Sequence, residues 1–281
     1  MRHDGRLFRT ILKTPLVLAA GFALLAPSAG EAQGDLLIAP TRLVLDGRRG
    51  GEVILSNQGS EPETYRVSLE LRRMDSDGNL QPVDAAQANA TEKAALEMIR
   101  YAPRRVTLPP QQPQSIRISA RPGADLPDGE YRVHLSFAAI PKVRAVTEAP
   151  PADKNGIAID LVPIYGIVMP IIVRKGELTV QAALANPRIV HGPKGDTFLV
   201  DMTRSGNESV YGDILVFPQG AKDPAFIARG IGVYPEIGTR HAGFGLTPQE
   251  AAAMKGRARI EFREAVEDGG ALIASVDAML G

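Results

Sequence analysis

The longest apolar stretch of the chain runs from Gly156 to Arg174. Read with the period of two that a β-strand imposes, alternate residues share a face. One face of this stretch carries Ile157, Ile159, Leu161, Pro163, Tyr165, Ile167, Met169, Ile171 and Val173. Two prolines and many β-branched residues argue against a buried helix, and Asp160 argues against a membrane span. Fully extended, the strand would measure about 55–60 Å, longer than most strands, so we expect its own sheet not to supply every partner.

Short strands recur before this stretch, as in a β-sandwich. A first strand over residues 35–46 is interrupted at Pro40, which confines it to an edge or to a kink where the chain changes sheets. Tyr131 follows Asp128 and Gly129, the arrangement of an immunoglobulin-type tyrosine corner. The Ala-rich residues 84–100 are compatible with a short helix. Further strands are predicted at residues 52–56, 65–72, 105–108, 115–119 and 131–137.

The strand pattern restarts after the predicted linker, residues 175–177. Strands are expected at residues 178–182, 197–202, 211–217, 225–227, 230–234, 257–262 and 271–276. Thr247 and Glu250 flank Pro248 as a capping box, which predicts a helix over residues 251–255. The sequence therefore predicts an all-β protein of two tandem immunoglobulin-like sandwiches, residues 33–174 and 175–281.

The first 32 residues have the composition of an export signal. Four basic residues lie before an apolar run over residues 16–25, and Gly30 and Ala32 would stand at −3 and −1 of a cleavage site. An uncleaved N-terminal anchor is the alternative. Cleavage after Ala32 would leave 281 − 32 = 249 residues.

Charge and cysteine content exclude several kinds of chemistry. Removing four basic and two acidic residues from 32 of each leaves 28 against 30, which gives no reason to expect binding to nucleic acid or to an anionic membrane. The chain has no cysteine, so it has no disulfide, zinc–thiolate site or cysteine nucleophile. Its stability must come from its hydrophobic cores.

No motif for catalysis or for a cofactor is present. The four histidines are scattered, and His134 is predicted to point outward beside Arg132 as an ordinary surface residue. Asp75–Asn79 resembles a calcium loop, but its glycine comes too early and position twelve is Ala86, so a hairpin turn is expected. Gly230–Pro235 lacks the third glycine of a dinucleotide site. We expect neither an enzyme nor a bound metal or cofactor.

Several segments, taken in order, resemble one known family. They are Ala39–Asp46, Val53–Asn57, Leu108 to Ile118, Tyr131–Pro141 and the long strand with Gly176. Together they are similar to the N-terminal domain of the periplasmic pilus-assembly chaperones of the chaperone–usher pathway. The second half resembles that family's smaller domain only in size and strand pattern.

The resemblance implies a periplasmic chaperone whose two domains meet at an L-shaped angle. Such a protein lends its long strand to a pilus subunit that lacks one strand and hands the subunit to an outer-membrane usher. The subunit-binding residues would be Ile157, Ile159, Leu161, Pro163 and Tyr165, with Arg42 holding the subunit's C-terminal carboxylate. Because an unprotected apolar row invites aggregation, a self-capping dimer is expected when no subunit is bound.

One feature departs from the family. Its second anchoring cation, a lysine on the long strand, would fall near Tyr165 or Gly166, and neither residue is basic. Two other functions remain open. A structural immunoglobulin-like surface or pilus component would more often show one incomplete sandwich. A carbohydrate-binding accessory module would need exposed aromatic residues, yet only 5% of residues are aromatic and none is tryptophan.

Overall fold

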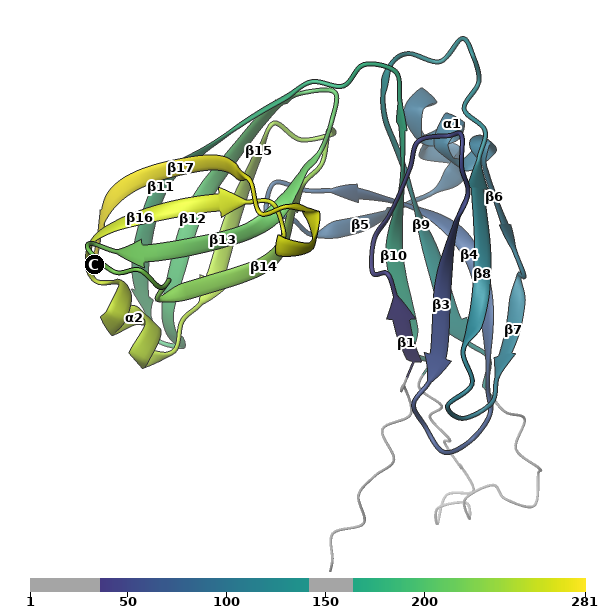
Figure 1. Ribbon diagram of the computed structural model, residues 1–281, viewed down its shortest axis with the longest axis horizontal. Coiled ribbons are helices and arrows are strands. Elements are labelled where there is room, and N and C mark those ends of the chain that lie inside the picture. The colour runs from purple at the N-terminus through teal and green to yellow at the C-terminus, as the bar shows by residue number, and fades with distance from the viewer. Residues whose placement is uncertain (1–35, 142–163) are drawn as a thin grey trace, which may run out of the picture. The chain divides into compact units, whose positions relative to one another are not determined.

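The computed structural model describes residues 36–141 and 164–281, which form two β-sandwiches with two short α-helices (Figure 1). The prediction of an all-β fold with two tandem sandwiches is confirmed. The signal at residues 1–32 lies outside the described residues, and the domain border at residue 174 stays a prediction. In the described residues, no helix is both long enough and apolar enough to cross a membrane.

The first sandwich is made of two sheets. One sheet has the order β1 (Leu36–Ala39), β3 (Gly51–Asn57), β8 (Gln114–Ala120) and β6 (Ile99–Ala102). The other has the order β2 (Leu43–Leu45), β10 (Gly166–Lys175), β9 (Gly129–Ala139), β4 (Glu63–Met74) and β5 (Leu80–Val83), and β7 (Arg105–Leu108) also pairs with β4. Of these strand pairs only β2 with β10 is parallel.

Pro40 separates two strands that belong to different sheets. β1 pairs with β3, whereas β2, which begins at Leu43, pairs with β10. Proline has no backbone N–H to continue a ladder, and of the two alternatives that the sequence left open, an edge or a change of sheet, the structure shows the change of sheet.

The tyrosine corner is present. The Tyr131 hydroxyl donates a hydrogen bond to the carbonyl of Pro127 at 2.7 Å, and burial raises the pKa of this phenol. The expected helix in the Ala-rich stretch is also present as α1 (Ala90–Met98), which begins with a capping box between Asn89 and Glu92. Asp75–Asn79 is the predicted turn, because Asp75 accepts hydrogen bonds from the backbone N–H groups of Asp77 and Asn79.

The second sandwich also has two sheets. One has the order β11 (Val180–Gly192), β12 (Gly195–Gly206) and β15 (Thr239–Gly245). The other has the order β14 (Phe226–Val233), β13 (Val210–Pro218), β16 (Gly256–Arg263) and β17 (Leu272–Leu280). Helix α2 (Pro248–Met254) starts at Pro248, three residues before the predicted start, because Thr247 is the N-cap.

The sequence reading missed three strands, and each has a physical reason. β5 contains a proline and pairs only with β4. β6 directly follows α1 in the stretch read as helix. β15 contains two glycines and is held by its pairing with β12. The two strands predicted at 225–234 are one strand, β14, which continues through Gly230 in a left-handed conformation, φ +71°.

Each sandwich has its own hydrophobic core. In the first, Leu55, Leu135 and Phe137 are among the fully buried side chains. In the second sandwich, Phe198, Ile214 and Phe262 are fully buried in the core. The cores hold β9 and β10 of the first sandwich and β13 and β16 of the second in fixed positions, and these strands carry the two sites described below.

Candidate functional site

Strand β10 has an open edge over its first half. β9 pairs with β10 along its entire length, from Gly166 to Lys175. On the other side β2 pairs only with Ile171, Ile172 and Val173. Among the described residues no strand covers the second side of Gly166–Pro170. Within the described part of the chain, the backbone groups that point to this side have no strand partner.

The side chains of β10 pass from the core to the surface along one face. Met169, Ile171 and Val173 are buried in the first core. Two and four residues before Met169, Ile167 is 38% exposed and Tyr165 is 51% exposed. Because these five residues share a face, the apolar row of the core continues out of the sandwich beside the open edge.

Most of the sequence-predicted site residues lie further along this row. Ile157, Ile159, Leu161 and Pro163 are outside the described residues. Tyr165 is described; it precedes β10, and its carbonyl accepts a hydrogen bond from the Ala139 N–H at 2.9 Å. The open edge thus begins beside the end of β9.

Arg42 lies where the pairing of β2 with β10 begins. It precedes Leu43, the partner of Ile171, so the parallel register places it beside Pro170. Its side chain is half-buried, and its Nε and Nη2 atoms are buried with no hydrogen-bond partner in the described part of the chain. The guanidinium stacks over the Tyr211 ring at 4.6 Å. Buried, unpaired N–H groups of this kind are suited to donate hydrogen bonds to a carboxylate of another molecule.

A second cation lies near Arg42, which the sequence reading missed. Arg132 on β9 forms an ion pair with Glu236, and its guanidinium stacks on the Tyr234 ring at 3.5 Å. Burial raises the pKa of Tyr234, while the charges of Arg132 and Arg42 oppose this rise. Both guanidinium groups are therefore within electrostatic reach of one phenol.

The sequence reading sought the second cation on β10 itself. Arg132 is on the neighbouring strand, opposite Ile172. The only sequence signal for it was its position as an outward-pointing arginine of an alternating strand. Such a pattern does not show which neighbouring strand the side chain will meet.

The prediction that His134 lies on the surface is wrong. Its side chain is 1% exposed, and neither ring nitrogen has a hydrogen-bond partner among the described residues. Burial, with the nearby charges of Arg132 and Arg72, lowers its pKa from 6.5 to about 3. The alternation of the strand correctly placed His134 on the face opposite the core residues Val133 and Leu135. It did not show that this part of the outer face is buried.

Two of the other histidines form isolated surface pairs. His191 contacts Asp196, and His241 contacts Asp201, each at 2.7 Å. Over the described ranges no group of three or more potential ligands is placed to hold a metal ion.

Comparison with known proteins gives structural similarity only. No protein-family model and no curated protein sequence matches the chain. The Pseudomonas aeruginosa CupB2 chaperone is 16% identical, with 87% of this chain and 100% of that chain covered and a TM-score of 0.45. The E. coli chaperone DraB is 14% identical, with 88% and 96% covered and a TM-score of 0.45.

A third solved structure contains a chaperone together with a pilus protein. It is the CsuC–CsuE chaperone–tip adhesion subunit complex of Acinetobacter baumannii. Its identity to this chain is 10%, with 87% of this chain and 97% of that chain covered and a TM-score of 0.42. All three structures contain a chaperone, and the CsuC–CsuE complex comes from the archaic chaperone–usher Csu pili. At these identities and TM-scores the similarity assigns no function to the chain.

Proposed function

We propose that the chain is a periplasmic chaperone that binds and caps pilus or fimbrial subunits and delivers them to an outer-membrane usher. The observation that carries the proposal is the open edge of β10 at Gly166–Pro170, with an apolar row beside it. An exposed edge of this kind accepts an extended segment by strand addition. A subunit whose own sandwich lacks one strand is the guest that such an edge completes.

Backbone and side chains have separate roles in this mechanism. Hydrogen bonds along β10 supply affinity, and side chains at alternate positions enter the gap in the guest's core. The donated row consists of Ile167 and Tyr165, continued by the sequence-predicted Ile157, Ile159, Leu161 and Pro163. Covering each large apolar side chain contributes roughly 1.5–3 kcal/mol. The folding of the guest against the donated strand supplies the driving force, so no nucleotide is needed.

Arg42 sets the end of the guest strand. It stands beside Pro170, at the last position before β2 occupies the edge. A guest strand that pairs with Gly166–Pro170 and ends there places its terminal carboxylate next to the unpaired Nε and Nη2 atoms. Arg132 adds positive charge nearby, but its pair with Glu236 leaves Arg42 as the principal anchor.

Replacing Ile167 by aspartate tests the strand donation. Ile167→Asp puts a charge into the row that must enter the guest's core, and we expect recovery of the subunit to fall by at least about tenfold. The measurement is the amount of subunit that copurifies with the tagged chain from the periplasm of its native host.

The matched control is Ile54→Asp. Ile54 is 42% exposed on β3 of the other sheet, so this variant makes the same chemical change at a similarly exposed position. Its recovery of subunit should equal that of the unchanged chain. If Ile167→Asp also recovers as much subunit as the unchanged chain, β10 is not the donated strand.

Replacing Arg42 tests the anchor. Arg42→Ala removes the guanidinium while leaving the open edge intact, so we expect the affinity for the purified subunit to weaken by at least about tenfold. Arg42→Lys should bind the subunit more tightly than Arg42→Ala but less tightly than the unchanged chain, because lysine keeps the charge but cannot pair with a carboxylate in bidentate geometry. Calorimetry with the subunit gives both values, and an unaltered affinity in Arg42→Ala would remove this residue from the site.

A further inference from the structure

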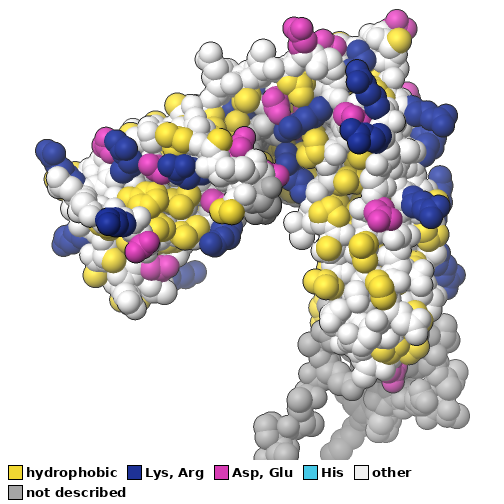
Figure 2. Space-filling view, viewed as in Figure 1, with side chains coloured by type: hydrophobic (Ala, Val, Ile, Leu, Met, Phe, Trp, Pro, Cys, Tyr) yellow, Lys and Arg dark blue, Asp and Glu magenta, His cyan; other side chains and the backbone are white. Residues whose placement is uncertain are grey.

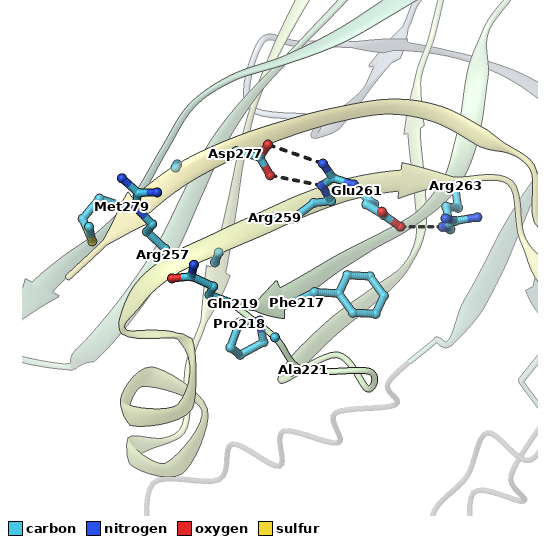
Figure 3. A pocket seen from close by; sticks show the side chains of 13 residues that line it. Phe217, Pro218, Gln219, Ala221, Arg257, Arg259, Glu261, Arg263, Asp277 and Met279 are labelled. Atoms are coloured by element: carbon cyan, nitrogen blue, oxygen red, sulfur yellow. Dashed lines mark hydrogen bonds and ion pairs between the residues drawn. The ribbon is translucent and has the colours of Figure 1, made fainter.

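The second sandwich carries a groove that the proposed function does not use. The groove has a volume of about 850 Å³, within the range of roughly 300–1,000 Å³ that is typical of binding clefts. It lies on the outer face of β13, β16 and β17 and is closed at one end by the residues that follow β13 (Figure 3). The opposite faces of these strands pack into the second core.

Part of the groove is apolar. Phe217 and Pro218 line it from the end of β13, and Met279 lines it from β17. Met279 is 66% exposed. Figure 2 shows hydrophobic side chains gathered over β13 and its neighbours, with basic and acidic side chains around them. Within the groove, the arginines of β16 lie between Phe217 on β13 and Met279 on β17 (Figure 3).

Three arginines of β16 also line the groove. Arg257, Arg259 and Arg263 share one face of the strand. Arg259 pairs with Asp277 through two contacts of 3.1 and 3.4 Å, and Arg263 pairs with Glu261 at 2.7 Å (Figure 3). Arg257 is exposed, and its guanidinium has no ion-pair or hydrogen-bond partner within the described residues.

These charges favour one class of ligand. Three arginines against Glu261 and Asp277 give 3 − 2 = +1 for the groove. The two carboxylates would repel a polyphosphate, whereas a peptide can place its carboxylates at chosen positions. Arg257 and Arg259 are two residues apart, about 6.7 Å along a strand, which is also the spacing of alternate side chains in an extended peptide. The exposed pair of Arg259 with Asp277 adds little stability, so Arg259 can exchange partners.

A second copy of this chain would fit less well. A twofold contact places the same surface on itself, so two net-positive grooves would face each other. A separate acidic segment has the complementary charge.

We propose that this groove binds an extended acidic peptide segment of a partner protein. Carboxylates two residues apart pair with Arg257 and Arg259, and an apolar side chain on the same face of the segment packs against Met279, the cross-strand partner of Arg257. The site is distinct from the edge of β10 and does not depend on strand donation.

The test uses the full chain and a defined probe. The probe is a fluorescein-labelled peptide, Gly-Asp-Ser-Asp-Ser-Leu-Gly, whose two aspartates and leucine share one face when it is extended, and its counterpart has asparagine in place of each aspartate. Fluorescence anisotropy measures affinity, and methyl NMR of the seven methionines locates the contact. The Met279 methyl signal should shift on adding the acidic peptide, while that of Met98, buried in the first core, should not.

Matched variants assign the binding to the groove. Arg257→Gln should weaken binding of the acidic peptide about tenfold and leave binding of the asparagine peptide unchanged. Arg188→Gln makes the same change at an exposed arginine of β11, in the other sheet, and should have no effect. Ile167→Asp should also bind the acidic peptide normally, which separates this site from the proposed donor strand.

Three results would overturn the inference. The first is an unshifted Met279 signal, and the second is an equal loss of affinity in Arg257→Gln and Arg188→Gln. The third is a Met279 shift that depends on protein concentration without peptide, which would make the groove a contact between copies of the chain.

Discussion

At the scale of single residues, burial changes what a side chain does. His134 is fully buried without a hydrogen-bond partner among the described residues, and its pKa is lowered to about 3. The neutral ring is therefore the form that the folded state contains at neutral pH. In the unfolded chain the same ring takes up a proton near pH 6.5. The folded and unfolded states bind different numbers of protons between these two values.

This difference predicts a pH-dependent stability. Because the folded-state pKa is depressed, the full stability is present above pH 6.5 and is progressively lost as pH falls toward about 3. The free energy of unfolding should fall by up to about 1.4 kcal/mol per pH unit from this one group. Urea denaturation between pH 6.5 and 5 measures the slope above the range in which most carboxylates titrate.

The variant His134→Phe removes the titrating group while keeping a ring in the buried space. The free energy of unfolding of this variant should change less steeply with pH over the same range than that of the unchanged chain, because the contribution of one titrating proton is missing. Identical slopes in the two proteins would show that His134 is accessible to protons in the folded state.

At the scale of elements, local signals decide where a helix begins, while pairing decides which strands form. Helix α2 has its complete start signal in the sequence: the Thr247 hydroxyl accepts from the Glu250 N–H at 3.2 Å, and the Glu250 carboxylate accepts from the Thr247 N–H at 2.8 Å. The backbone N–H and the hydroxyl of Thr247 both donate to this carboxylate and lower the pKa of Glu250. The helix then buries Met254 in the second core. By contrast, β15 has no strong strand pattern and is formed by pairing with β12.

The capping box gives a prediction for α2. Thr247→Ala removes the acceptor for the Glu250 N–H, so the free energy of unfolding should fall by about 1 kcal/mol. Thr247→Ser keeps the hydroxyl and should cost less than half as much. Urea denaturation of the two variants measures the difference, and equal losses in both would mean that the threonine methyl group, not the cap, stabilises this end of the helix.

At the scale of the whole molecule, two cores hold the chain together without any disulfide, and among the described residues the first half of β10 pairs with a strand on one side only. The chain has no cysteine and carries 32 acidic and 32 basic residues, so net repulsion does not keep copies of it apart. We infer that the exposed Ile167 and Tyr165 beside this edge of β10 favour association between copies of the chain.

We predict that the free chain forms dimers reversibly through this edge. Ile167→Lys places a charge on the edge and should shift the association to at least about tenfold higher protein concentration. Ile54→Lys, on the other sheet, should associate like the unchanged chain. Sedimentation velocity over a concentration series measures the equilibrium, and a chain that stays monomeric at every concentration would contradict the prediction.

The residues of the candidate site were predictable to different degrees. Arg42 and the apolar row ending in Tyr165 were visible in the sequence, because a strand pattern and a basic residue after proline are local features. Arg132 was not predicted as a second cation, since its proximity to Tyr234 joins residues about a hundred positions apart. The groove at Arg257 was not predicted either, because it needs three strands side by side.

By itself the sequence determined the strand periodicity, the tyrosine corner and the capping box of α2, because each depends on neighbouring residues and local backbone chemistry. Only the tertiary structure decided which half of β10 has a partner on both sides, that His134 is covered, and that the arginines of β16 line a groove. These features depend on which distant strands lie next to one another, and alternation along a single strand gives its two faces without saying what each face meets.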